Sequence, residues 1–149
     1  NLAAQQSTVE KGKRVYLNAL AVYAVHSYLK WLQIPTNLNQ SNCFNAAKAA
    51  LSNVGDLVIP DIGILECCPV LPQQTVILLP NAIEHQIGSV AIQFQERLDS
   101  VQLLGFAPAF DEVNAPTQLA LSELQPLDTL LEQMTRLEEA IAFLQTDDP

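Results

Sequence analysis

The sequence predicts an α+β domain, and three features of its pattern lead to that class. A long apolar segment near the N-terminus predicts a buried helix, short apolar runs between residues 57 and 107 predict strands, and heptad spacing near the C-terminus predicts an amphipathic helix. The 149 residues are 49% hydrophobic and 15% charged, which excludes an intrinsically disordered chain. A chain of this length buries enough surface for one core, so we expect a single domain over residues 1–149.

The first element is expected to be a long helix over residues 7–33. Ser7 and Glu10 have the spacing of a capping box, which predicts the start of the helix. Pro35 disfavours helical geometry at the residue before it and predicts the end. From Val15 onward apolar residues cover nearly the whole circumference, which is typical of a helix buried on several sides.

A short helix and a set of strands are expected next. Ser41 or Asn42 is suited to cap an alanine-rich helix over residues 44–53, and Gly55 is suited to end it. Short apolar runs joined by short turns then predict an antiparallel meander of about five strands. The expected strands cover residues 57–59, 64–70, 76–79, 88–95 and 101–107, with a sixth short run at 118–121, a helical turn at 81–86, a turn at 96–100 and a loop over 110–117.

The last element is expected to be an amphipathic helix from Pro126 to about residue 145. Its apolar residues alternate at spacings of three and four, which is a heptad seam. One interpretation is that the seam packs inside the domain, so that both long helices lie on one face of the sheet. The other is that it binds a partner helix or a second copy of the chain. The candidate partner interface on this seam consists of Leu130, Met134, Leu137 and Ile141.

The charge is divided unevenly between the two parts of the chain. Residues 1–50 carry five basic residues and one acidic residue (+4), whereas residues 51–149 carry two basic and fifteen acidic residues (−13). The overall charge of −9 argues against a nucleic-acid partner, because phosphate backbones attract basic surfaces. Lys11, Lys13 and Arg14 are a candidate basic handle for a partner, or they neutralise the acidic part of their own fold.

The three cysteines, Cys43, Cys67 and Cys68, indicate a reducing compartment. An odd count in a chain of this length does not form a disulfide framework, so the cytoplasm is the expected location. The adjacent pair should point to opposite faces of a strand. No signal peptide is recognisable, and polar residues interrupt the apolar segment over residues 15–32, so no membrane association is expected.

No motif of the sequence predicts catalysis, and we expect no catalytic, cofactor-binding or metal-binding residue. His26 and His85 lack the spacing of metal ligands. Cys43, just before a predicted helix, is the one thiol suited to nucleophilic catalysis, but no neighbouring residue supplies a base. Asp61 and Glu66 are interpreted as surface carboxylates.

Several segments, in order along residues 5–145, resemble an uncharacterised cyanobacterial family, the domain of unknown function DUF 1822. The resemblance rests on residues 15–25, 56–60, 65–67, 69–72, 103–106 and 121–127. It implies no established activity, and it implies a cytoplasmic regulatory or interaction role only through neighbouring genes for sigma factors and sensors. Members are often longer, so this chain is expected to be the N-terminal part of a longer protein. Cys68 stands where the family tends to have an arginine, and residues 42–46 also depart from its pattern.

Two functions are therefore weighed. The first is a non-enzymatic interaction or regulatory module that binds a protein partner, with a homodimer as one form of it. The alternative is a small-ligand sensor with a pocket between the first helix and the sheet, lined by the aromatic residues of that helix. A thiol enzyme based on Cys43 is a third hypothesis, which predicts that alkylation of this residue abolishes an activity.

Overall fold

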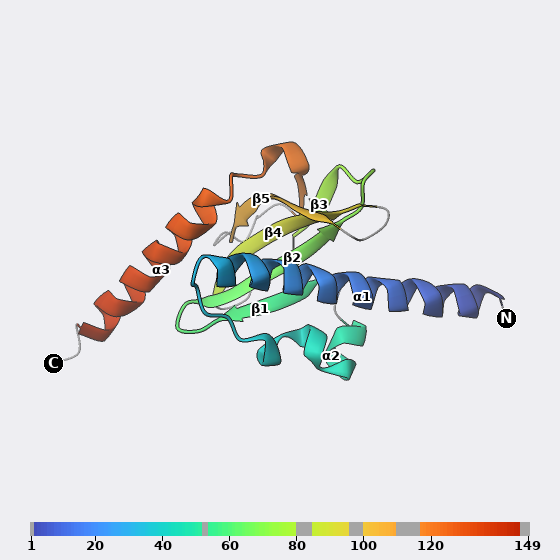
Figure 1. The fold of residues 1–149 in the computed structure, drawn as a ribbon, viewed down its shortest axis with the longest axis horizontal. Coiled ribbons are helices and arrows are strands. Elements are labelled where there is room, and N and C mark those ends of the chain that lie inside the picture. Colours follow the sequence, from blue (N-terminus) through green and yellow to red (C-terminus); the bar gives the residue numbers. More distant parts are fainter. Residues whose placement is uncertain (1, 52–53, 80–84, 96–99, 110–116, 147–149) are drawn as a thin grey trace.

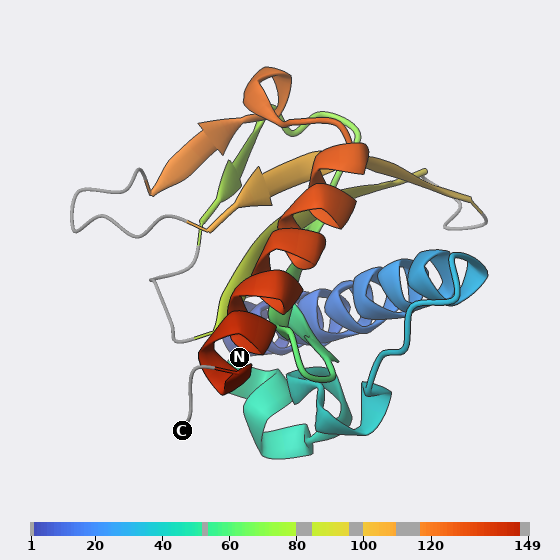
Figure 2. The same ribbon diagram turned by 90° about the vertical axis from the view of Figure 1, so that its left-hand side faces the viewer.

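The computed structural model describes residues 2–51, 54–79, 85–95, 100–109 and 117–146. Its centre is a four-stranded sheet (Figure 1). Two long helices cover one face of this sheet, and a two-stranded sheet covers the other (Figure 2). The prediction of an α+β fold with a long helix at each end is confirmed.

The first helix, α1 (Leu2–Trp31), starts before the predicted capping box at Ser7. It was expected to be buried on several sides, but Tyr16, Tyr23 and Trp31 are 55%, 58% and 78% exposed. The first turns of α1 extend past the end of the sheet, as Figure 1 shows on the right-hand side. The apolar residues around the helix therefore predicted more burial than the structure shows. The residues that enter the core lie on one side of the helix: Leu17, Ala21, Val22, Val25 and Leu29.

The end of α1 is a Schellman motif. Gln33 has a positive φ of 65°, its N–H donates to the carbonyl of Lys30 (2.9 Å), and the N–H of Ile34 donates to the carbonyl of Leu29 (2.8 Å). Ile34 also packs against the core that contains Leu29. The helix thus ends at Trp31, before the limit that Pro35 predicted.

The segment where one helix was predicted, residues 44–53, contains the end of a 3-10 turn and a short α-helix. A 3-10 turn, η1 (Leu38–Gln40), precedes a second one, η2 (Asn42–Phe44), and α2 (Ala46–Leu51) follows. Ser41 caps η2, because its Oγ accepts a bond from the N–H of Cys43 (3.2 Å). The Asn45 side chain accepts from the N–H of Lys48 (3.1 Å) at the start of α2. The expected end of the helix at residues 52–53 lies outside the described residues.

The strands were placed correctly along the chain, but the expected antiparallel meander is wrong. The sheet order is β1-β2-β4-β5, and β2 pairs with β4 in parallel. A parallel pair needs a long crossover, and here residues 71–85 supply it. That connection contains β3, which leaves the sheet and pairs with β6 over the opposite face. The strands are β1 (Gly55–Ile59), β2 (Gly63–Val70), β3 (Val76–Leu78), β4 (Gln86–Phe94), β5 (Val101–Pro108) and β6 (Gln118–Ala120).

Alternating side chains of the sheet belong to two separate cores. Leu65 and Cys67 of β2 face the two long helices, whereas Cys68 and Val70 face β3 and β6. The prediction that the adjacent cysteines point to opposite faces is confirmed, and both are buried. The three cysteines are free thiols.

The last helix, α3 (Asp128–Thr146), follows a 3-10 turn, η3 (Leu121–Glu123), and packs on the same face of the sheet as α1. Figure 2 shows α3 crossing in front of the sheet. The predicted helical turn at 81–86, the turn at 96–100 and the loop at 110–117 fall largely outside the described residues.

Candidate binding site

A groove runs between the first half of α1 and the chain that leaves β2. It consists of two adjoining hollows of about 460 and 340 Å³, which we call together the α1 groove. Both hollows are lined by Lys13 and Leu17 of α1 and by Leu71 and Gln74 of the turn after β2. The groove therefore lies where α1 passes the end of the sheet, beside residues of the predicted basic handle.

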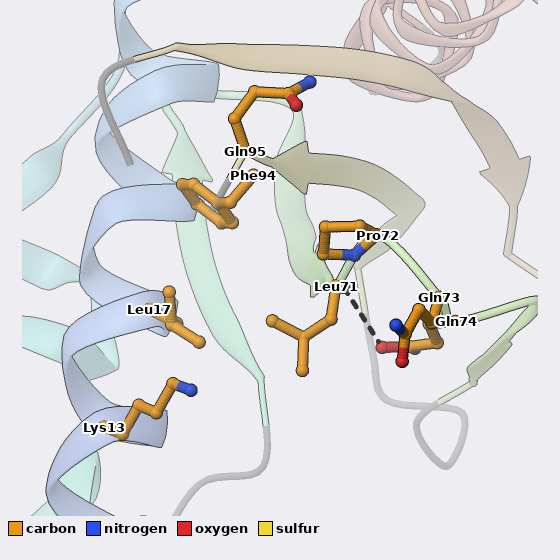
Figure 3. A pocket seen from close by; sticks show the side chains of 8 residues that line it. All are labelled: Lys13, Leu17, Leu71, Pro72, Gln73, Gln74, Phe94 and Gln95. Carbon is orange, nitrogen blue, oxygen red and sulfur yellow. Dashed lines mark hydrogen bonds between the residues drawn. The ribbon is translucent and has the colours of Figure 1, made fainter. Parts of the chain in front are cut away.

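The larger hollow is mainly apolar and has one cation at its edge. Figure 3 shows Lys13 and Leu17 pointing from α1 toward Leu71, with Phe94 farther along the same hollow. The turn opposite α1 is tied by Gln74. Its Oε1 accepts from the N–H of Leu71 (3.4 Å), and its Nε2 donates to the carbonyl of Val76 (2.7 Å). These bonds order the wall of the groove that faces the helix.

Two residues that line the smaller hollow each carry a buried polar atom that has no hydrogen-bond partner among the described residues. Arg14 and Asn18 lie one helical turn apart on the same side of α1. The Nη2 of Arg14 donates to the carbonyl of Ala50 (3.3 Å), but its Nε and the Oδ1 of Asn18 are buried without a hydrogen bond. Asn18 is only 2% exposed. Native proteins seldom leave such atoms unpaired, so they indicate a place that an occupant or water completes.

Gly55 at the start of β1 fixes the position of Asn18. A Cβ atom at Gly55 would lie 2.4 Å from Cγ2 of Val22 and 2.9 Å from the backbone oxygen of Asn18. α1 therefore lies directly on the backbone of β1 at this point, which only a glycine permits. This contact holds the buried part of α1 in place while the preceding turns border the groove.

The structure separates the three residues of the candidate basic handle. Lys13 and Arg14 line the smaller hollow together, whereas Lys11 is exposed and is not part of the groove lining. Glu10 lies in the same hollow and offsets part of the positive charge. The groove thus has a modest basic character on its helical wall.

The structure also divides the candidate partner interface on α3. Leu130 and Met134 are buried in the core of the domain, at 0% and 3% exposure. Leu137 and Ile141 are half-buried, and Leu144 is 72% exposed. The first half of the seam thus packs inside the domain, and the second half becomes progressively more exposed as the helix leaves the sheet.

Glu66 was interpreted as a surface carboxylate, and this is wrong. Its side chain is 6% exposed and lies on the face of the sheet that β3 and β6 cover. Burial, and to a smaller extent the carboxylate of its cross-strand neighbour Asp56, raise the pKa of Glu66 to about 7. Its place in the sequence between Leu65 and Cys67 did not indicate this, because neighbouring residues of a strand point to opposite faces and the cover of the second face was not predicted.

The remaining candidates for chemistry are dispersed. Burial raises the pKa of the Cys43 thiol, and Asp56 adds to this, although a hydrogen bond with Ser41 acts the other way. This disfavours the thiolate that a nucleophile requires. Nδ1 of His26 bonds with Oγ1 of Thr36, and His85 is exposed in a turn with a φ of 62°.

Two kinds of feature are absent from the described residues. No helix in this part of the chain combines the length and the apolar character that crossing a membrane requires. Histidines, cysteines and carboxylates of these residues nowhere gather in threes as a metal site would need.

Comparison with known proteins gives one match. The model of a family described as a protein of unknown function (DUF1822) matches residues 1–148. Neither the curated proteins nor the solved structures that were compared gave a match. The match covers nearly the whole chain and confirms the family resemblance that the sequence motifs indicated.

Proposed function

The chain belongs to the DUF1822 family, and from this premise we propose that it is a non-enzymatic module that holds a segment of a partner protein in the α1 groove. The observation that carries the proposal is a pair of buried atoms, Nε of Arg14 and Oδ1 of Asn18, which have no partner in the part of the chain that the structure describes and belong to residues that line an apolar hollow. Leaving such atoms unpaired costs about 1–3 kcal/mol each. An occupant that bonds to both would recover that free energy.

The lining of the groove favours binding over catalysis. Its polar groups are two cations, one carboxylate and several side-chain amides, which fix the orientation of an occupant. The one thiol in the lining is Cys68. Burial and the nearby Glu66 raise its pKa, a hydrogen bond with Ser89 lowers it, and the resulting pKa is about 12. A thiol with that pKa stays protonated at neutral pH and is a poor nucleophile.

The test is a selection of peptides from a displayed random library on the immobilised protein. Lys13→Glu places a negative charge in the groove, and Lys30→Glu makes the same change on an exposed residue at the other end of α1. We expect the selected peptides to bind Lys13→Glu about tenfold more weakly and Lys30→Glu unchanged. Equal binding to both variants, or no selected peptide, would overturn the proposal.

A second candidate function is small-ligand binding in the same groove. The volume of the smaller hollow, about 340 Å³, supports it, because small-molecule sites begin at roughly 300 Å³. The ligand pocket expected from the sequence was lined by aromatic residues of the first helix, and Tyr16, Tyr23 and Trp31 do not line this groove. A fragment screen by NMR tests it: fragments should shift signals of Leu17 and Leu71 and should compete with the selected peptides.

The proposal also covers the cellular location of the chain, its source and the kind of role that its binding serves. We propose that the chain acts in the cytoplasm of a cyanobacterium and that its binding role is regulatory. The free state of Cys43, Cys67 and Cys68 supports a reducing compartment. Fractionation of the source cells, with an antibody against the chain, tests the location. Recovery of the chain outside the cytoplasm would contradict it.

A further inference from the structure

The wall of the α1 groove opposite the helix is the edge of a strand. β3 pairs with β6 through bonds from Leu79 N–H to the Thr117 carbonyl and from Leu121 N–H to the Thr75 carbonyl, both 2.9 Å. This register directs the main chain of the even-numbered residues of β3 to its other edge. Among the described residues, no strand pairs with β3 on that side. On that edge Nε2 of Gln74 already donates to the carbonyl of Val76 (2.7 Å), so among the described residues the groups left for pairing are the N–H of Val76 and the N–H and C=O of Leu78. β3 therefore brings a partly open strand edge to the groove, which its Ile77 and Leu78 line.

On the helical wall, two buried atoms have no partner among the described residues, and one needs an acceptor while the other needs a donor. Nε of Arg14 needs an acceptor, and Oδ1 of Asn18 needs a donor. A phosphate or an ionised carboxylate provides acceptors only and would leave Asn18 unsatisfied. An extended peptide presents N–H and C=O groups along both of its edges, so it supplies the acceptor and the donor together.

We propose that the α1 groove binds its partner by strand addition, in which an extended segment pairs with the open edge of β3 and turns its other edge toward Arg14 and Asn18. This inference rests on the proposed function and specifies the partner segment. Strand addition draws affinity from the main chain and specificity from alternate side chains. One set of side chains meets the apolar residues Leu17 and Leu71, and an acidic residue fits opposite Lys13.

Charge complementarity determines whether the bound partner segment is acidic or basic. Lys13 and Arg14 face the groove together against the single carboxylate of Glu10. The segment that fits is therefore an acidic strand in which carboxylates alternate with apolar side chains. A basic segment would meet two cations, and a helical one would keep its N–H and C=O groups within its own backbone.

The first experiment compares two synthetic peptides of about ten residues, a length typical of a long strand. One alternates glutamate with valine and the other alternates lysine with valine, both with blocked ends. Fluorescence anisotropy should show that the acidic peptide binds wild type at least about tenfold more tightly than the basic one. Lys13→Glu should remove the preference, and Lys30→Glu should keep it. Equal affinities for the two peptides would overturn the acidic assignment.

The second experiment tests the strand itself. Methylating the backbone nitrogens of all valines removes the donors from one edge of the acidic peptide, and methylating those of all glutamates removes them from the other. We expect either change to weaken binding about tenfold, because β3 uses one edge and Asn18 the other. Leucine has about the same shape as asparagine but cannot accept a hydrogen bond. In the Asn18→Leu variant, methylation of the peptide edge that faces residue 18 should therefore no longer weaken binding. Circular dichroism would confirm that each variant is folded.

The outcomes separate this inference from the proposed function. Tight binding that survives methylation of both edges would overturn strand addition while leaving the groove as a protein-binding site, provided that Lys13→Glu still weakens it. The acidic peptide could fail to bind while the peptides selected by display bind wild type and lose affinity in Lys13→Glu. That result would also overturn strand addition and leave the proposed function standing. Failure of every peptide in both experiments would overturn both proposals.

Discussion

The two faces of the four-stranded sheet are covered in different ways. The face under α1 and α3 has a continuous apolar core that includes Leu29, Phe94 and Phe106. The face under β3 and β6 has a smaller apolar cluster, and beside it lie the buried polar residues Glu66 and Ser89. The helical face therefore supplies most of the packing that fixes the fold. The α1 groove lies where α1 and β3 border the same hollow, so the proposed binding site is at the boundary between the two faces.

The largest expected effect tests the helical face. Leu29→Ala should lower the free energy of unfolding by about 3 kcal/mol, because it removes a fully buried side chain and leaves a cavity. Tyr23→Ala on the same helix is the control and should change it by less than about 0.5 kcal/mol, since this side chain is 58% exposed. Urea unfolding measures both. Similar losses for the two variants would show that the helical face is not the main source of stability.

The next prediction compares the two halves of α3. Met134→Ala should cost about 2–3 kcal/mol, because Met134 is 3% exposed in the core. Leu144→Ala, on the same seam, should cost less than about 0.5 kcal/mol, because Leu144 is 72% exposed. Guanidinium unfolding at several protein concentrations measures both. A concentration-dependent loss in Leu144→Ala would instead make the end of the seam an interface between two copies.

The extent of the elements was predictable because apolar periodicity is a local property. The strands at 57–59, 64–70 and 101–107 and the final helix lie within a few residues of their predicted places, since their burial repeats with the period of the element. Strand order was not predictable in this way. β3 has an apolar pattern that fits either sheet, and only the packing of its Ile77 over the opposite face assigns it to β6.

The candidate site was predictable only in part. Lys13 and Arg14 were found because they belong to the basic part of the sequence, residues 1–50, and charge is visible in a sequence. Asn18 was not found, because one polar residue in an apolar helix does not show whether its amide has a partner. Glu66 was missed for a related reason. A carboxylate next to a turn resembles a surface residue until both neighbouring strands and the cover of the sheet are known.

The third prediction tests the polar face through the pH dependence of stability. The pKa of Glu66 is raised from 4.5 to about 7 by burial, so the folded state binds this proton more tightly than the unfolded chain does. Stability should therefore fall by about 2–3 kcal/mol as the pH rises from 4.5 to 7, and the Glu66 contribution should be constant outside that range.

Glu66→Gln should remove this fall and should be more stable than wild type at pH 8. Glu132→Gln, an exposed residue of α3, is the control and should keep the wild-type slope. Thermal unfolding between pH 4 and pH 8 measures all three proteins. The same slope in wild type and Glu66→Gln would show that the buried carboxylate is ionised on both sides of this range.

The smallest expected effect tests the boundary where the groove lies. Asn18→Leu should raise the free energy of unfolding by about 1 kcal/mol, because it replaces a buried, unpartnered acceptor by an apolar group of similar size. Asn42→Leu is the matched control and should lower it. The Asn42 amide donates to the carbonyl of Val54 (3.0 Å), and its Oδ1 accepts from the N–H of Asp56 (3.0 Å).

A gain in stability at Asn18 together with a loss of peptide binding would mean that the folded chain tolerates an unfavourable residue because the partner needs it. That combination separates a binding residue from a structural one, since a structural asparagine would lower stability when replaced, as Asn42 should. If Asn18→Leu loses stability as Asn42→Leu does, the Asn18 amide is already satisfied in the free protein. The groove would then have no unmet hydrogen-bonding group to offer a strand, and the acidic peptide should bind Asn18→Leu as well as wild type.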